Sequence, residues 1–131
     1  IELEEENYTK AIEYFKKAIS LLPFQSSPWF DSHAVFIDPL ALAYYKSGDI
    51  KAAQLEYEKI IHLTSGRISY GDIYAKSFFM LGKIYEQQGD TAQAIKNYEK
   101  FLDLWKDADP GIAEVEDARK RLAGLKIPKS L

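Results

Sequence analysis

The chain has 131 residues, and its 17 lysines and arginines against 20 aspartates and glutamates give a formal net charge of −3. A nucleic-acid-binding domain needs basic residues clustered on one face, so this charge balance argues against nucleic acid as a partner. Cysteine is absent, which excludes disulfides, thiolate nucleophiles and cysteine-based zinc sites. With 47% hydrophobic and 14% aromatic residues, the chain is too apolar to remain disordered.

Membrane insertion and export are also disfavoured. No apolar run approaches the roughly 20 residues that a membrane-spanning helix needs. The amino end, IELEEEN, is acidic, whereas a secretory signal begins basic and continues apolar. We therefore expect a cytoplasmic protein with no membrane segment, and the periplasm is the alternative compartment.

The first predicted helix covers residues 7–22. Its apolar residues fall at spacings of three and four, as in an amphipathic helix, and Pro23 ends it. The segment that follows, PFQSSPWFDS, is predicted to be a loop in which Asp31 or Ser32 caps the next helix. The apolar stripe of the first helix consists of Tyr8, Ala11, Ile12, Phe15, Ala18, Ile19 and Leu22.

The second predicted helix begins near Asp31 and ends at Gly48, and Pro39 lies in its middle. Proline cannot donate the backbone hydrogen bond of a helix interior, so we expect a kink there. In the alternative, Asp38 caps a shorter helix with Pro39 in its first turn, and residues 31–37 are irregular. The periodicity favours the kinked helix, with a buried stripe made of Ala34, Ile37, Leu40, Ala41 and Tyr44.

The rest of the chain continues with the same helical period. A helix over 50–63 completes a unit at 31–64, two helices fill the unit 72–106, and a final helix covers 110–125. The final helix has acidic residues early and basic residues late, which suits the helix dipole, and we expect it to cap the array. The predicted buried residues are Ile50, Ala53, Tyr57, Ile60 and Ile61, then Tyr74, Phe78, Leu81, Gly82 and Tyr85, then Ala94, Tyr98, Phe101, Leu102 and Trp105, and finally Ile112, Val115, Ala118, Leu122 and Leu125.

Two of these segments repeat each other. YYKSGDIKAAQLEYEKI, which begins at Tyr44, shares its skeleton with YEQQGDTAQAIKNYEKF. One constant offset pairs Gly48 with Gly89 and Asp49 with Asp90, and it also aligns Tyr44 with Tyr85, Ala53 with Ala94 and Tyr57 with Tyr98. Each glycine can adopt the left-handed conformation that ends one helix, while the aspartate caps the next. Such a helix pair cannot bury its apolar face alone and must stack on another pair.

The repeat resembles the tetratricopeptide repeat, whose signature is W-x2-L-G-x2-Y, then A-x3-F, then P. The first half is matched by Ile37, Leu40, Ala41, Tyr44 and by Phe78, Leu81, Gly82, Tyr85; the second by Ala11, Phe15, Ala18, Pro23, by Ala53, Tyr57, Ile60 and by Ala94, Tyr98, Phe101. The step from Ala53 to Ala94 is longer than the roughly 34 residues of the family, and the first copy lacks its opening helix. The resemblance implies an all-α fold: a right-handed superhelix of antiparallel helix pairs, a single tetratricopeptide-like α-solenoid over residues 1–131 that ends in the capping helix.

The resemblance also implies a function in protein–protein interaction. In the family, the first helices of successive pairs line a concave groove that receives a segment of a partner protein. The predicted groove residues are Val35, Asp38, Leu42, Tyr45, Lys46, Lys76, Phe79, Lys83, Glu86 and Gln87. Some relatives hold the terminal carboxylate of chaperone tails with paired lysines and asparagines. The matching positions here are Asp38, Leu42, Phe79 and Lys83, so we expect no chaperone-tail binding.

No catalytic, cofactor-binding or metal-binding residues are predicted, and the chain is expected not to be an enzyme. The two histidines, His33 and His62, lie far apart, and no phosphate loop or metal-ligand spacing accompanies them. Carboxylate pairs such as Glu114 and Glu116 are interpreted as helix-start charges. The aromatic residues of the loops could either pack under the loop or form a binding patch, and we favour packing. They are Phe24, Trp29 and Phe30 in the first loop, and Tyr70, with Arg67, in the equivalent loop.

Two functional roles remain open. The sequence opens inside a repeat, and its ending, WKDADP…ARKRL, is similar to the carboxy-terminal arrays of bacterial multidomain signalling proteins. We therefore expect the scaffold to be a regulatory or sensory part of a larger protein. The alternative is a self-association module that forms a homodimer, because Ile12, Phe15 and Ile19 lack a preceding helix to cover them.

The repeat register generates a first prediction. Ala94 occupies a position where two helices approach closely, so Ala94→Leu is expected to overpack the contact and lower the free energy of unfolding by about 1–3 kcal/mol. Thermal melting measures the change. A variant that melts at the same temperature as the parent chain would show that the register is wrong.

Overall fold

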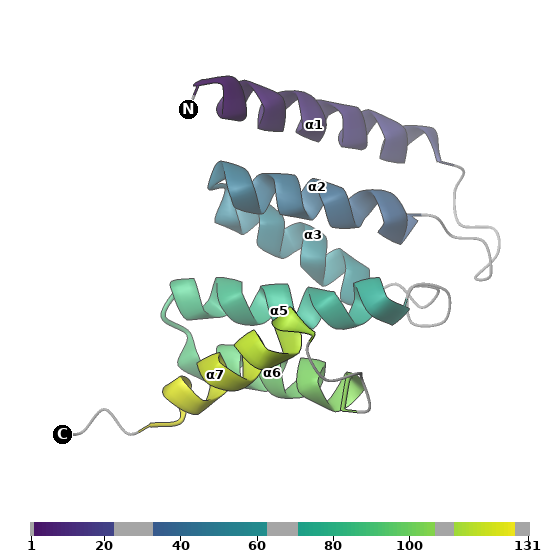
Figure 1. The fold of residues 1–131 in the computed structure, drawn as a ribbon. Coiled ribbons are helices and arrows are strands. Elements are labelled where there is room, and N and C mark those ends of the chain that lie inside the picture. Colours follow the sequence, from purple (N-terminus) through teal and green to yellow (C-terminus); the bar gives the residue numbers. More distant parts are fainter. Residues whose placement is uncertain (1, 23–32, 63–70, 107–111, 128–131) are drawn as a thin grey trace. The chain divides into compact units, whose positions relative to one another are not determined.

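The computed structural model describes residues 2–22, 33–62, 71–106 and 112–127. Every secondary-structure element in these ranges is an α-helix, as Figure 1 shows. The helices are α1 (Glu2–Leu21), α2 (His33–Ser47), α3 (Ile50–His62), α5 (Gly71–Gln87), α6 (Thr91–Leu104) and α7 (Ala113–Leu125). The predicted all-α class of paired helices is therefore confirmed for the described part of the chain.

The helix bounds differ from the predicted ones mainly at the ends. The first helix begins at Glu2, earlier than expected, because the acidic residues before Asn7 continue the helical conformation. The second runs unbroken from His33 through Pro39, so the alternative in which residues 31–37 are irregular is wrong for residues 33–37. The expected ends at Pro23, Asp31 and Ser32 lie outside the described residues.

The chain divides into two compact units, Ile1–Ser77 and Phe78–Leu131, and the boundary falls within α5. In the first unit, α2 packs against both α1 and α3. In the second, α6 packs against α7 and, through aromatic rings, against α5. The single array over residues 1–131 remains an expectation.

Two sharp turns connect the paired helices in the same way. Gly48 and Gly89 have φ of 94° and 79°, in the left-handed region that favours glycine. The residue after each glycine donates a backbone hydrogen bond to the last turn of the preceding helix. Asp49 N donates to Tyr44 O at 3.0 Å, and Asp90 N donates to Tyr85 O at 2.9 Å. This bond, together with the one from the glycine N–H, forms a Schellman motif. The predicted left-handed glycines are thus confirmed.

Each aspartate then caps the following helix. The Oδ1 atom of Asp49 accepts from Ala52 N, and that of Asp90 accepts from Gln93 N, both at 3.2 Å. These bonds satisfy backbone donors that have no partner within the helix. One glycine and one aspartate therefore end a helix, reverse the chain and begin the next helix, as predicted.

Helix packing confirms the small residues of the repeat. Ala41, Ala53 and Ala94 have no exposed surface. A Cβ atom added at Gly82 would lie 2.6 and 2.7 Å from ring carbons of Tyr98, so the two helices approach too closely for any side chain there. The ring of Tyr98 is fully buried and leaves no room for adjustment.

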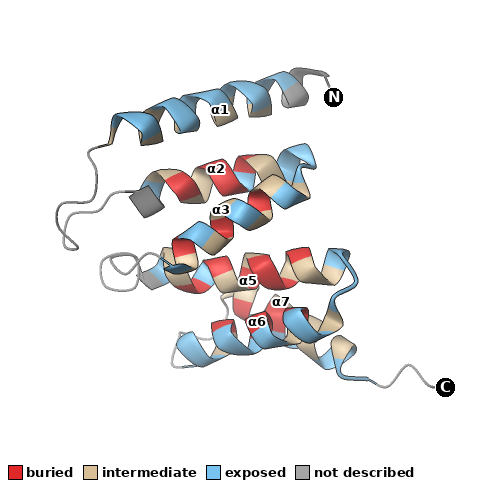
Figure 2. Ribbon diagram, turned by 180° about the vertical axis from the view of Figure 1, so that it is seen from behind, coloured by how far each residue is buried: buried red, intermediate tan, exposed pale blue. Residues whose placement is uncertain are grey.

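The buried face of α5 is wider than predicted. Leu81 and Gly82 are buried as expected, but Tyr74, Phe78 and Tyr85 are only half-buried. The residues that are buried instead, besides these two, are Ala75, Ser77, Phe79 and Ile84. A single stripe of period 3.6 does not describe a helix covered on more than one side. Figure 2 shows buried positions along α2, α3, α5, α6 and α7 but none on the described part of α1.

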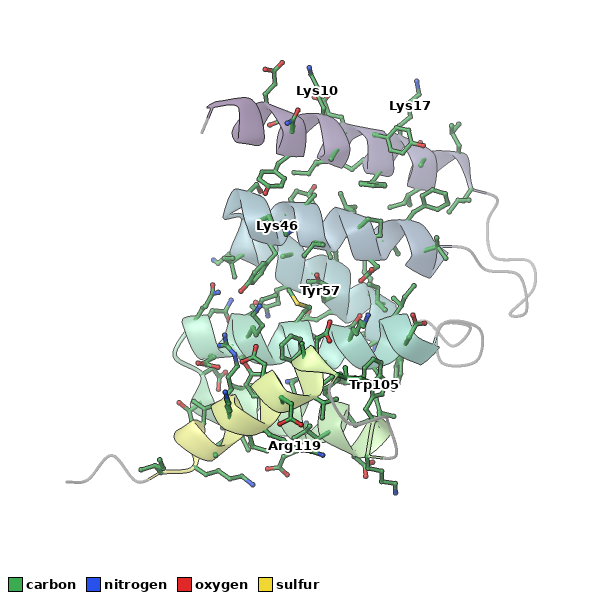
Figure 3. The ribbon with its side chains drawn as sticks, viewed as in Figure 1. Lys10, Lys17, Lys46, Tyr57, Trp105 and Arg119 are labelled. Atoms are coloured by element: carbon green, nitrogen blue, oxygen red, sulfur yellow. The ribbon has the colours of Figure 1, made fainter. Side chains whose placement is uncertain are left out.

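The outer side of α1 is charged. Lys10 and Lys17 extend from the side that faces away from α2 (Figure 3), and Lys10 pairs with Glu6 at 2.9 Å. The apolar residues Ile12, Phe15 and Ile19 are half-buried. This arrangement is that of an amphipathic helix with one face packed on its neighbour.

The contact at Gly82 generates the second prediction. Gly82→Ala is expected to lower the free energy of unfolding by about 1–3 kcal/mol, because its methyl group would collide with the Tyr98 ring. Gly124 is the matched control, since it lies in α7 and a Cβ there meets nothing within 4 Å. Gly124→Ala should be neutral or stabilise by up to about 1 kcal/mol. Urea unfolding distinguishes the two, and equal effects of both variants would contradict the close approach.

Candidate protein-interaction surface

The predicted groove residues divide between the two compact units. Val35, Asp38, Leu42, Tyr45, Lys46 and Lys76 belong to the first unit, and Phe79, Lys83, Glu86 and Gln87 belong to the second.

In the first unit, α2 carries an exposed stripe. Val35 and Leu42 are 40% and 38% exposed, which is unusual for large apolar side chains on a helix packed on two sides. Lys46 is exposed and Asp38 is half-buried, and both lie at helical spacings from these apolar residues. One face of α2 therefore presents apolar, acidic and basic groups in a row.

Asp38 has an unusual electrostatic environment. Burial raises the pKa of its carboxyl group above the usual value of 3.8. Lys76 opposes this rise and Asp72 adds to it, so charges from the first turns of α5 act on a carboxylate of α2. The carboxylate is thus partly withdrawn from water, and Lys76 is the cation whose charge acts on it.

Tyr57 extends this environment onto α3. Its side chain is 1% exposed, and burial is the main reason that the pKa of its phenol is raised. The negative charge of Asp38 and the phenol of Tyr45 raise it further. Groups from α2, α3 and α5 therefore influence one another around Asp38, and the phenol of Tyr57 stays protonated at neutral pH.

Phe79, in the second unit, does not lie where the groove prediction places it. It is 6% exposed, and its ring centroid lies 5.3 Å from that of Phe101 and 6.1 Å from that of Tyr98. The expectation that Phe79 is exposed is wrong because its side chain fills the core between α5 and α6. Lys83 places its ammonium group 5.5 Å from the centroid of the same ring.

Glu86 is engaged within the second unit. The hydroxyl of Tyr98 donates to its Oε1 atom at 2.8 Å, and Arg121 NH1 donates to the same oxygen at 3.3 Å. Arg121 also donates from Nε to Asp117 at 3.0 Å. One carboxylate therefore joins α5, α6 and α7, which gives Glu86 a structural role in docking the last helix.

These contacts change the titration of both partners of Glu86. Burial and the hydrogen bond to Glu86 raise the pKa of Tyr98, so its hydroxyl remains a donor. Burial acts to lower the pKa of Arg121, but the interactions with Tyr98, Asp117 and Glu86 outweigh it and raise that pKa overall. The network is therefore intact over the whole neutral range.

Asp72 acts on Asp38 although it is not among the predicted groove residues. It lies in the first turn of α5. The spacing of residues along the sequence does not relate Asp72 to Asp38, because only the packing of the first unit lets their charges interact. The loop residues Phe24, Trp29, Phe30, Arg67 and Tyr70 lie outside the described residues.

The described ranges show no metal centre and no membrane span. In them, no three or more histidine, aspartate or glutamate side chains form a group that could hold a metal ion. None of their helices is both long and apolar enough to cross a membrane.

Comparison with known proteins identifies the repeat. The family model described as tetratricopeptide repeat matches residues 1–23 and 75–104. These two segments of the chain are therefore similar to tetratricopeptide repeats. The α2–α3 pair lies between the matched segments and has the same glycine–aspartate turn as the matched α5–α6 pair. A search of curated proteins gave no match. Tetratricopeptide repeats generally mediate protein–protein interaction.

The buried carboxylate of the first repeat pair generates the third prediction. Below the usual pKa of 3.8, Asp38 is neutral in both the folded and the unfolded chain, so Asp38→Asn should change stability little. As the pH rises through the raised folded-state pKa, ionisation costs the folded state free energy. Asp38→Asn should therefore be more stable than the parent chain at neutral pH, as urea unfolding at several pH values would show.

The control is Asp103→Asn, which removes the same charge from an exposed position on α6. Its effect should stay within about 0.5 kcal/mol at every pH. A parent chain that gains stability relative to Asp38→Asn as the pH rises would contradict the assigned direction.

Proposed function

We propose that this tetratricopeptide repeat chain is a protein-interaction scaffold that binds a partner segment on the exposed face of α2 and the adjoining start of α5. The contact residues are Val35, Asp38, Leu42, Tyr45, Lys46 and Lys76, which we name the α2 surface. The single observation that carries the proposal is the half-buried Asp38 carboxylate flanked on its own helix by two exposed apolar side chains.

Energetics supports a functional role for this surface. A carboxylate that is withdrawn from water and placed near Asp72 costs stability, and folded chains keep such groups where they serve binding. Val35 and Leu42 would gain free energy if a partner covered them, because each still exposes more than a third of its surface. The partner segment should therefore present apolar side chains and a cation for Asp38.

The second unit contributes less to the proposed contact. Phe79 is buried and Glu86 is engaged by Tyr98 and Arg121. Lys83, Glu86 and Gln87 remain predicted contact residues of that unit. We further propose a regulatory or sensory role within a larger signalling protein, in the cytoplasm, which the resemblance of the carboxy-terminal segment supports.

Self-association is the alternative, and one observation favours it. Tyr14 and Leu21 on α1 are 65% and 75% exposed, although the neighbouring apolar residues pack toward α2. A second copy of the chain could cover them. Analytical ultracentrifugation across a concentration range decides between the two roles. If the α2 surface binds a partner and the chain does not self-associate, it should remain a monomer. In the alternative it should form a dimer, and the double variant Tyr14→Ser, Leu21→Ser should dissociate that dimer.

The fourth prediction tests the α2 surface. A peptide library displayed on phage and selected on the whole chain is expected to return segments that combine apolar residues with lysine or arginine. Leu42→Ser should weaken a selected peptide by about tenfold, because an apolar contact would be lost. Asp38→Asn should weaken it also, although that variant is more stable.

Leu55→Ser is the matched control, since Leu55 is an exposed leucine, 59% accessible, on α3. It should leave peptide affinity unchanged. Binding that survives both substitutions on α2, or that Leu55→Ser removes, would place the interaction elsewhere.

A further inference from the structure

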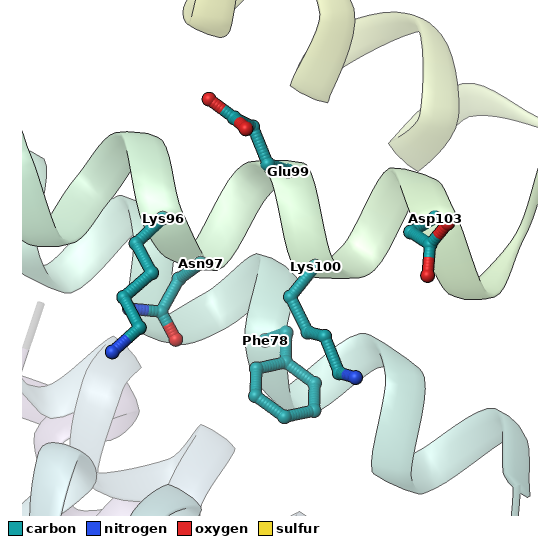
Figure 4. A pocket seen from close by; sticks show the side chains of 6 residues that line it. All are labelled: Phe78, Lys96, Asn97, Glu99, Lys100 and Asp103. Atoms are coloured by element: carbon teal, nitrogen blue, oxygen red, sulfur yellow. The ribbon is translucent and has the colours of Figure 1, made fainter.

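A depression in the second unit does not select a partner by its charge. It has a volume of about 620 Å³ and is lined by Phe78 of α5 and by Lys96, Asn97, Glu99, Lys100 and Asp103 of α6 (Figure 4). Its two lysines are equalled in number by its two carboxylates, so the lining favours neither an anion nor a cation. The α2 surface is more selective, because its exposed apolar groups have a defined spacing.

These apolar groups form one narrow stripe along α2. Among residues 35–45, only Val35 and Leu42 are exposed. They lie seven residues apart, which is about two helical turns and about 10.5 Å along the axis of α2. Asp38 is half-buried between them, about one turn from each. A partner segment that follows this stripe must therefore present two apolar groups with a polar group between them.

The spacing of the stripe distinguishes between backbone conformations of such a segment. In an extended strand, side chains on one face lie about 6.7 and then about 13.4 Å apart. A polyproline II segment presents one side chain about every 9.3 Å on the same side and none between. An α-helix presents residues i, i+3 or i+4, and i+7 on one face, and they span about 10.5 Å. Of these three conformations, the helix alone matches Val35, Asp38 and Leu42 together.

The corresponding positions of α5 are not an apolar stripe. The constant offset of the repeat places Lys76 and Lys83 at the two apolar positions of α2, and it places the buried Phe79 between them. A segment that used the same positions on both helices would meet apolar groups on α2 and lysines on α5. The exposed apolar side chains therefore favour a segment that lies along α2 itself.

We propose that the partner segment of the α2 surface is an α-helix that lies along α2. Its apolar residues are seven positions apart and cover Val35 and Leu42, and a lysine or arginine between them faces Asp38. This inference rests on the proposed function and adds the conformation and the residue spacing of the segment. A segment that is already helical binds more tightly than a flexible one of the same composition, because less conformational entropy is lost.

The fifth prediction uses the whole chain and a defined probe. The probe is an acetylated and amidated peptide of alanine and glutamine with two leucines seven residues apart. Lysines three and four residues after the first leucine place a cation opposite Asp38 in either orientation. The alpha-carbon chemical shifts of the peptide should move to helical values on binding, as nuclear magnetic resonance would show. Proline at the outward-facing position five residues after the first leucine should weaken binding by about tenfold or more, because it breaks the helix.

Two variants of the chain locate the contact. Leu42→Ser should weaken the probe, whereas Leu55→Ser, at an exposed leucine of α3, should leave its affinity unchanged. If Leu42→Ser weakens the probe but the proline peptide binds equally well, or the bound shifts are not helical, the helical conformation is wrong and the α2 surface still binds. If Leu42→Ser has no effect, or no binding occurs at about 1 mM peptide, the α2 surface is not the contact and both proposals are overturned.

Discussion

The structure depends on the short turn that joins the helices of a pair. Because a glycine in the left-handed region and an aspartate that caps the next helix make up most of the connection, the second helix returns directly along the first. Such a tight return leaves no space for large side chains where the helices cross. Ala41 and Gly82 on the first helices, and Ala53 and Ala94 on the second, meet this requirement. The turn and the small residues are therefore parts of one geometric constraint.

Large residues at neighbouring positions then fill the remaining volume. Tyr57 and Tyr98 are almost completely buried, yet each carries a hydroxyl that burial makes reluctant to ionise. The two tyrosines occupy equivalent places in the repeat but have different surroundings. The hydroxyl of Tyr98 donates to Glu86, and through it to the docking of α7 by Arg121. Tyr57 lies within the influence of Asp38, on the surface where we propose that a partner binds. The same core position thus adjoins the docked last helix in one unit and the surface proposed to bind a partner in the other.

This difference explains why the two units are not expected to bind alike. In the second unit, Glu86 accepts a hydrogen bond from Tyr98, and Phe79 is buried in the core. In the first unit, Val35 and Leu42 stay exposed, and the half-buried carboxylate of Asp38 is under the opposing influences of Lys76 and Asp72. The exposed apolar side chains and the partly buried carboxylate are unfavourable in the free chain. A partner that covers the apolar groups and places a cation beside Asp38 would therefore gain binding free energy.

The helical class, the repeat, the turns and most of the core could be predicted from the sequence, because each depends on local spacing. Gly48, Asp49 and their counterparts are recognisable since the requirement for a left-handed residue and a capping side chain acts within a few residues of the chain. Tertiary structure alone decided which side of α5 is buried, since that helix is covered on more than one side and a single stripe could not show that Phe79 is buried and Phe78 half-exposed. It also decided that Glu86 meets Arg121 and that Asp72 acts on Asp38, because electrostatic partners far apart in sequence become neighbours only when helices pack.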